Sequence, residues 1–520
     1  MRIYTTSPEL LEDRRLDPYY YDPIFVEHEQ EIKKAFPQRD SIGDKFHVLD
    51  GTHDSVDTRE SADHEYTVKF LRSQDIGECL LRPDAGAYLR HSDHIGKCKR
   101  SKIYHGDVLL NIMASTGQAC LYFNSYPSEA NANRAVGILR SREAKPIEDE
   151  NLFLSVLLSS RAGGLELARN LKGSIQQRLN LSDIAEARFP RVALLACRYI
   201  GDKVRQAERL RAFADSLAVD LIERFSLAEY IKVRRTSHHH PCTTQNLACE
   251  RLDAPFYLPE HIELKHALQS ASGVPLGTYC QLIAERWKKK EPEFLYFEIG
   301  SLDVDSGRIT PVKTKTIEAA SRAQRLLKPG DVLVSTVRPN RKNVGLVTQQ
   351  QNGDLPLVAS TGFAVLRFPD KVTAAFFHAW LRSDVATQQL VQWNAGGSYP
   401  AIEEEVVPRI LVPAFSAETI CEIGRKCIAG MQARDLSAEL CEVAKLLVES
   451  LIERKVTEDE LISAQMRLDL GDDLADRAIV SRLFEGGWDA KETRPLFSDL
   501  DAYFETVRMV EREQRKVAAK

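Results

Sequence analysis

The sequence has 520 residues, of which 43% are hydrophobic and 28% are charged, and this indicates a folded protein of two or more domains. Its N-terminus lacks the apolar core of a signal peptide, and no run approaches the ~18 apolar residues that a membrane span requires. The ten cysteines are scattered and form no CxxC pair, so they predict free thiols in a reducing compartment. We therefore expect a soluble, cytoplasmic protein without a membrane partner.

The net charge of −5 is concentrated near the C-terminus. Residues 456–520 carry 10 basic and 15 acidic side chains, so residues 1–455 are neutral overall. Two segments of this neutral part are basic: residues 97–142 hold 7 basic and 2 acidic side chains, and residues 286–345 hold 13 and 7. Such segments are compatible with a nucleic-acid partner, although an ordinary solvated surface gives the same pattern.

The chain contains one internal duplication. His105-Gly-Asp-Val-Leu-Leu recurs as Pro329-Gly-Asp-Val-Leu-Val, 224 residues later. Four more pairs of landmarks follow the same order: Arg15-Leu-Asp with Arg251-Leu-Asp, Ala135–Arg140 with Phe363–Arg367, Gly173-Ser with Gly397-Ser, and Leu221-Ile-Glu-Arg with Leu451-Ile-Glu-Arg. Landmarks in one order at a nearly constant offset describe a tandemly duplicated unit.

Each copy begins with a mixed α/β part. Short apolar runs between Gly, Pro and Asn turns predict strands at 108–112, 332–337 and 363–366. In both Gly-Asp pairs, we expect the glycine to permit a tight turn and the aspartate to hydrogen-bond it. The duplicated parts therefore predict mixed, β-rich cores.

Each copy ends in a predicted long helix with apolar residues three, four or seven positions apart. The first series is Ile200, Val204, Ala207, Ala214, Leu217, Leu221 and Phe225; the second is Ile420, Ile423, Cys427 and Met431, then Leu440, Ala444, Leu447 and Leu451. Each helix thus predicts a seam that is buried against a partner helix, and the two copies are natural partners. Arg434, Asp435 and Ser437 interrupt the second seam, which weakens the prediction there.

Two further sequence patterns are of types that can carry chemistry. Asp17-Pro-Tyr-Tyr is superficially like the Asp-Pro-Pro-Tyr signature of adenine methyltransferases, but no glycine-rich cofactor loop precedes it, so a structural turn is the better interpretation. Residues 234–250 are predicted to be a linker; their histidines and cysteines fit no tetrahedral zinc pattern, which favours an exposed loop. The residues concerned are His238, His239, His240, Cys242 and Cys249. No Walker, HExxH or GxSxG motif occurs.

The landmarks together resemble the specificity (S) subunits of type I restriction–modification enzymes. The shared features are Arg-Leu-Asp opening each half, Gly-Asp-Val-Leu in the middle, and a Gly-Ser loop before a short helix and a Pro-ended strand, over roughly residues 10–455. The resemblance implies two similar α/β target recognition domains joined by two long, antiparallel, coiled-coil-like helices. The implied domains are 1–190 (first recognition domain), 191–233 (first helix, ~60 Å long), 234–250 (linker), 251–415 (second recognition domain), 416–457 (second helix) and 458–520 (acidic helical extension).

The resemblance also implies a function. The chain would be a non-catalytic subunit that recognises a bipartite, asymmetric double-stranded DNA site. It would direct two adenine-N6 methyltransferase subunits, and optionally a restriction/translocase subunit, in restriction–modification or phage defence. No cofactor or metal is expected in this chain, because S-adenosylmethionine would bind to the methyltransferase. The alternatives are a coiled-coil scaffold of a defence complex, and a divergent nuclease or methyltransferase.

Base recognition requires paired donors and acceptors: Arg or Lys for guanine, and Asn or Gln for adenine. The candidates in the first copy are Asn131, Asn133, Arg134, Gln176, Gln177 and Arg178. Those in the second are Arg338, Asn340, Arg341, Lys342 and Asn343, together with Ser398 and Tyr399 of the Gly-Ser loop. The expected phosphate contacts are Lys97, Lys99, Arg100, Lys102, Lys313, Lys315, Arg322 and Arg325.

The acidic extension departs from the pattern of the S subunits. We expect it to contact a partner protein or to cover a basic surface; the alternative is a solvated helical tail.

Overall fold

The computed structural model describes residues 18–82, 85–113, 117–172, 177–217, 221, 251, 253–304, 306–348, 355–395 and 399–485. The expected linker with its histidines and cysteines, Asp17, Gln176, Ser398 and residues 486–520 lie outside these ranges. The chain forms two compact units, unit 1 (Met1–Ala212 and Arg434–Lys520) and unit 2 (Phe213–Ala433).

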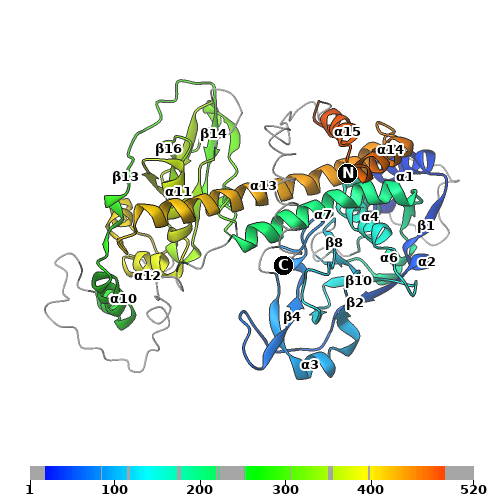
Figure 1. Ribbon diagram of the computed structural model, residues 1–520, viewed down its shortest axis with the longest axis horizontal. Helices are drawn as coiled ribbons and strands as arrows, with labels where there is room; N and C mark the ends of the chain where they lie inside the picture. Colours follow the sequence, from blue (N-terminus) through cyan, green and yellow to red (C-terminus); the bar gives the residue numbers. More distant parts are fainter. Residues whose placement is uncertain are drawn as a thin grey trace. The chain divides into compact units, whose positions relative to one another are not determined.

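Unit 1 combines a two-stranded sheet, a four-stranded antiparallel sheet and a five-stranded mixed sheet with helices (Figure 1). Its strands are β1 (Arg39–Ser41), β2 (Phe46–Asp50), β3 (Thr58–Arg59), β4 (Tyr66–Leu71), β5 (Ala87–Arg90), β6 (Lys102–Ile103), β7 (Val108–Asn111), β8 (Ala119–Leu121), β9 (Ala130–Ala132), β10 (Val136–Ser141) and β11 (Arg188–Pro190). Its helices are α1 (Pro23–Ala35), α2 (Ile42–Lys45), α3 (His91–Ile95), α4 (Glu148–Ser159), α5 (Arg161–Ala168), α6 (Leu181–Glu186), α7 (Leu194–Ser216), α14 (Glu458–Asp469) and α15 (Leu474–Glu485).

Unit 2 also combines short strands with helices, but its described part has fewer helices than that of unit 1. Its strands are β12 (Val274–Pro275), β13 (Gln281–Leu282), β14 (Glu293–Phe297), β15 (Val312–Lys315), β16 (Ala323–Leu326), β17 (Val332–Ser335), β18 (Val344–Leu346), β19 (Leu357–Ser360), β20 (Phe363–Arg367) and β21 (Leu411–Val412). Its helices are α10 (Pro259–Ser270), α11 (Lys371–Leu381), α12 (Asp384–Gln392) and the first part of α13 (Ala417–Ile452).

The two units share one topology, apart from the additional edge strand β3 in unit 1. The antiparallel sheet β2-β10-β7-β8 of unit 1 corresponds to β13-β20-β17-β18 of unit 2. The second sheet has the order β3-β5-β4-β9-β6 in unit 1 and β15-β14-β19-β16 in unit 2, and each contains one parallel pair, β4 with β9 and β14 with β19. The predicted mixed α/β fold and its tandem duplication are therefore confirmed.

The duplicated Gly-Asp motif builds the same turn in both units. Gly106 and Gly330 have φ values of 89° and 93°, which suit glycine. Asp107 accepts hydrogen bonds from the Tyr104 amide (2.8 Å) and from Arg140 Nε and Nη2 (2.9 and 2.7 Å). The expected turn is confirmed, and the motif gains an arginine partner on the neighbouring strand.

The equivalent contacts recur in unit 2. Asp331 accepts hydrogen bonds from the Lys328 amide (2.7 Å) and from Arg367 Nε and Nη2 (2.8 and 2.7 Å). Both carboxylates are almost fully buried. Burial raises the pKa of Asp107 although Arg140 opposes that shift, and the hydrogen bonds to Asp331 raise the pKa of Arg367.

In unit 1, α7 and the C-terminal part of α13 run antiparallel (Figure 1). The Ala193 amide, just before α7, donates to Glu458 Oε1 beyond the end of α13, and Ser437 Oγ donates to the Ala207 carbonyl in mid-helix (2.5 and 2.7 Å). The apolar residues Ile200, Val204, Ala207, Leu440, Ala444 and Leu447 are buried. This part of the predicted seam is confirmed.

The structure corrects two details of the helices. Ser437 does not interrupt the seam: α13 is continuous from Ala417 to Ile452, and the buried Ser437 hydroxyl bonds to α7. The start of α13 also enters the core of unit 2, where Ile420 and Ile423 are buried in one cluster with Leu221 of the first series. As described, α7 has 23 residues and α13 has 36, which correspond to about 35 and 54 Å. Phe225 and the rest of 222–233 lie outside the described residues.

The described part of the C-terminal extension is helical and folds onto unit 1. Lys203 on α7 and Asp476 on α15 form an ion pair at 2.6 Å with side chains 1% and 4% exposed, so α14 and α15 are not a solvated tail. None of the described helices is long and apolar enough to cross a membrane.

Candidate nucleic-acid interface

In unit 2, four turns meet where strands end. The turn at Thr361 and Gly362, after β19, is joined to Arg322 by a bond from the Thr361 amide to the Arg322 carbonyl (2.8 Å). The Thr336 amide, after β17, donates to the Gly362 carbonyl (2.9 Å), and the Arg338 amide donates to the Pro400 carbonyl (2.8 Å). We call this assembly loop cluster 2; it comprises Arg322, Thr336–Lys342, Thr361–Gly362 and Tyr399–Ala401.

In unit 1, the topologically equivalent turns form loop cluster 1. The Ile112 amide, after β7, donates to the Ala135 carbonyl, and the Leu179 amide donates to the Ile112 carbonyl, each at 3.1 Å. Because β6 pairs antiparallel with β9, Lys99 and Arg100 precede β6 at the end of the sheet where Asn133 and Arg134 follow β9. Loop cluster 1 comprises Lys99–Arg100, Ile112–Met113, Asn133–Arg134 and Gln177–Arg178.

Equivalent backbone pairs flank the last segment of each cluster. Lys172 and Arg178 exchange two backbone hydrogen bonds (3.1 and 2.9 Å), as Ala395 and Ala401 do in unit 2 (2.8 and 3.0 Å). The bridge between Met113 and Arg178 matches the bridge between Val337 and Ala401. These equivalent pairs therefore flank the two segments that carry the Gly-Ser landmarks, which lie outside the described residues.

Loop cluster 2 presents an arginine against an exposed aromatic ring. The Arg338 guanidinium carbon lies 4.7 Å from the ring centroid of Tyr399, whose side chain is 72% exposed. Arg338 and Lys342 have φ values of 51° and 54°, in the left-handed region that residues other than glycine rarely adopt. Backbone strain on both sides of Pro339–Arg341 is typical of functional loops.

The basic candidates fall into two groups. Several form ion pairs within the protein: Lys97 with Asp93, Arg178 with Asp50, Lys313 with Glu293, Arg325 with Glu404, and Lys342 with Asp384. Others are exposed and form no ion pair with the described residues: Lys99, Arg100, Arg134, Lys315, Arg322 and Arg341. All of this second group except Lys315 belongs to the two clusters. Exposed, unpaired cations are the groups available to phosphates.

The structure does not place every candidate on the expected surface. Asn131 is fully buried, and its amide bonds to the Cys98 carbonyl (2.8 Å), to Ser101 Oγ (3.1 Å) and to His94, so it holds unit 1 together instead. Asn343 is 7% exposed and also lies in the interior. Lys313 and Lys315 lie on β15, at the opposite edge of the sheet from Arg322 and β16. Lys102 is half-buried on β6.

The remaining described candidates differ in exposure. Gln177 and Asn340 are exposed within their clusters. Asn133 is half-buried, with its side-chain oxygen accepting the Ala135 amide (3.0 Å). The sequence analysis did not identify Thr336 and Thr361, which join the turns of loop cluster 2. It also did not identify the role of Arg140 and Arg367 as partners of the Gly-Asp motifs. The signal for these two arginines was their matching position after the two motifs.

Fold and interface together define a class: a tandemly duplicated α/β protein in which each copy presents a cluster of strand-end loops and continues into a long helix. No protein-family model and no curated protein matches the chain.

Solved structures of type I restriction–modification S subunits are similar to 80% of the chain. The S subunit from M. genitalium matches with 14% sequence identity and a TM-score of 0.38, over 94% of its own length. The HsdS subunit from Thermoanaerobacter tengcongensis matches with 14% identity and a TM-score of 0.24, over 96% of its length. A structure of the type I R-M system described for complex assembly and conformational transition matches with 16% identity and a TM-score of 0.26, over 97% of that chain.

Proposed function

We propose that this chain is a non-catalytic DNA-recognition subunit. It recognises a bipartite, asymmetric double-stranded DNA site, each half through one loop cluster, and directs adenine-N6 methyltransferase subunits to that site. The observation that carries the proposal is the pair of topologically equivalent clusters with different exposed side chains. Equivalent geometry suits two half-sites, and different side chains make the site asymmetric.

The chemistry of the clusters supports DNA as the ligand. Arginine donates two parallel hydrogen bonds to guanine, and asparagine or glutamine pairs with adenine. The contact of Arg338 with the Tyr399 ring limits the freedom of the arginine side chain before DNA binds, which lowers the entropy lost on binding. Exposed cations beside it, such as Arg322 and Arg341, would hold the phosphates and set the register.

The partners are part of the proposal. S-adenosylmethionine and the transferred methyl group would be handled by two methyltransferase subunits, and a restriction/translocase subunit would join in systems that cleave DNA. This chain would contribute the sequence specificity and act in the cytoplasm. The scaffold alternative predicts no sequence preference, and the enzyme alternative predicts activity of the isolated chain with a methyl donor.

The test is a map of N6-methyladenine in genomic DNA. Cells that contain the methyltransferase would carry the wild-type gene, no gene, or the Arg338→Ala/Arg341→Ala variant. We expect one split motif with the wild-type gene, no motif without it, and altered or lost specificity in one half of the motif with the variant. Lys265→Gln, which removes an exposed cation on α10 of the same unit, is the matched control and should leave the motif unchanged. Methylation that does not depend on the gene would contradict the proposal.

A further inference from the structure

The C-terminal helices are attached to α7 by a buried ionic contact. Asp476 on α15 accepts hydrogen bonds from Lys203 Nζ and from the Tyr199 hydroxyl, each at 2.6 Å. All three side chains are buried, with Lys203 among the largest fully buried side chains. A buried lysine without its carboxylate is strongly unfavourable, so this contact allows α15 only one position on α7.

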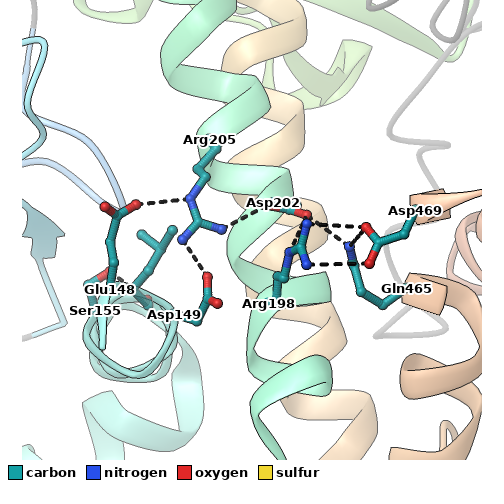
Figure 2. Close-up of polar contacts among 9 residues, drawn as sticks. Glu148, Asp149, Ser155, Arg198, Asp202, Arg205, Gln465 and Asp469 are labelled. Atoms are coloured by element: carbon teal, nitrogen blue, oxygen red, sulfur yellow. Dashed lines mark hydrogen bonds and ion pairs between the residues drawn. The ribbon is translucent and has the colours of Figure 1, made fainter. Parts of the chain in front are cut away.

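A second contact joins α14 to the same helix (Figure 2). Gln465 Nε2 donates to Asp202 Oδ2 at 3.2 Å and to Asp469 Oδ1 at 3.1 Å. Arg198 on α7 lies 3.1 Å from Asp469 Oδ1. Four side chains of α7, the pairs Arg198/Asp202 and Tyr199/Lys203, thus hold the two helices of the extension, and the members of each pair are one turn apart.

Contacts on the opposite side of α7 join this helix to the first globular domain. Arg205 on α7 donates to Glu148 Oε1 at 3.0 Å and to Asp149, both in the first turn of α4 (Figure 2). Close packing supports the contact, because a Cβ added at Gly201 of α7 would lie 3.0 Å from Leu152 of α4. The α4 helix contacts strands β7 and β8, and β7 leads directly into loop cluster 1.

Asp202 connects the two sides. Its Oδ1 accepts from Arg205 Nη1 at 2.7 Å, and its Oδ2 accepts from Gln465. The Asp202 carboxylate therefore orients Arg205, which contacts α4, and it also binds Gln465 of α14.

We infer that α14 and α15 are an intramolecular brace that fixes the first recognition domain on α7, with Asp202 as its positioning residue. Restricting Arg205 from both sides lowers the freedom of α4 to rock against α7. Since this inference rests on the proposed function, its consequence for DNA concerns spacing: a domain held at one angle on its helix accepts one spacer length between half-sites, and a released domain accepts several.

The first measurement does not depend on DNA. Hydrogen exchange of the full chain is compared between wild type, Gln465→Ala, which removes the contact from the extension, and Asp202→Ala, which removes the shared carboxylate. We expect faster exchange in the first two turns of α4 in both variants and little change in Asp202→Glu, which keeps a carboxylate. Asp459→Ala, an exposed acidic residue of α14 outside the network, is the matched control. Unchanged exchange in α4 overturns the inference.

The second measurement is spacer preference in the assembled methyltransferase. On sites with the native spacer and with one base pair more, we expect the ratio of methylation rates to fall about tenfold in Gln465→Ala, with the half-site sequences unchanged. Faster exchange in α4 with an unchanged spacer ratio would also overturn the inference, because the contact would then be structural only. If the wild-type complex shows no split motif, the proposed function fails, and the α4 exchange still decides whether the brace exists.

Discussion

Asp331 shows how one side chain serves both a turn and a sheet. Its carboxylate, 1% exposed, accepts from the Lys328 amide inside the turn and from Arg367 on the adjacent strand β20. The strand pairing of β17 with β20 places these partners, since Val332 lies opposite Leu366, one residue from Arg367. The ion pair therefore depends on the correct register of two strands.

Replacing Asp331 should loosen the sheet beneath loop cluster 2. Asp331→Asn keeps the shape but leaves Arg367 without its charge partner, and we expect a loss of about 3 kcal/mol in local stability. Hydrogen exchange of the β17 amides would measure it. Glu293→Gln, which removes the exposed partner of Lys313, is the control and should cost below about 1 kcal/mol. Equal effects of the two substitutions would contradict the structural role of Asp331.

His378 makes the stability of unit 2 depend on pH. Burial, together with the charge of Arg382, lowers the pKa of His378 from 6.5 to about 3 in the folded protein. The unfolded chain therefore binds a proton between these values while the folded chain does not, so stability is complete above pH 6.5 and falls as the pH decreases. At pH 5 the loss from this histidine is about 2 kcal/mol.

The variant His378→Leu tests this prediction by urea unfolding at pH 7.5 and pH 5. The variant will be less stable at pH 7.5 if its packing is poorer, but its loss of stability between the two pH values should be smaller than that of the wild type by about 2 kcal/mol. The difference between pH values, and not the absolute stability, is the quantity to compare. The same pH dependence in both proteins would show that His378 does not control it.

At the scale of elements, the packing of α7 on α13 depends on a small polar residue. Ser437 fits beside Ala207 and donates its buried hydroxyl to that residue's carbonyl. Ser437→Ala should cost about 1 kcal/mol through the lost hydrogen bond. Ser437→Leu should cost more, about 2–3 kcal/mol, because its extra atoms force the helices apart. Hydrogen exchange of α7 and of the C-terminal half of α13 measures both, and a leucine variant as stable as the wild type would contradict this packing.

The same residue shows what the sequence can predict about helices. A period of three and four residues identifies the buried face, because burial of apolar side chains dominates the stability of each helix. It does not reveal that a serine at the seam is satisfied by the facing backbone, or that Ile420 and Ile423 enter the core of unit 2. Those outcomes depend on the distance between packed elements, which no local pattern contains.

At the scale of the molecule, the duplication was predictable and the interface only partly so. Repeated landmarks revealed two copies because each copy needs the same turns, such as Gly106-Asp107 and Gly330-Asp331. The turn-rich basic segments of the sequence contain most of the residues of both loop clusters. Burial could not be predicted: Asn131 and Asn343 belong to equally polar segments, but tertiary hydrogen bonds and packing place them in the interior.

Two localised clusters on a neutral body predict a specific dependence of DNA affinity on salt. Lys99, Arg100 and Arg134 in loop cluster 1, and Arg322, Arg338 and Arg341 in loop cluster 2, form no ion pair with the described residues. If all six contact phosphates, the slope of log K against log salt for the isolated chain is about −5, and neutralising the three of either cluster with glutamine reduces it to about half.

The control takes its charges from outside the clusters. Lys265, Lys313 and Lys315 are exposed lysines of unit 2, two of them on the far edge strand β15, and their triple replacement by glutamine should leave the slope unchanged. Fluorescence anisotropy at several salt concentrations measures each slope. If the control reduces the magnitude of the slope as much as either cluster variant does, DNA affinity comes from diffuse surface charge. The two loop clusters would then not be the DNA-binding surfaces.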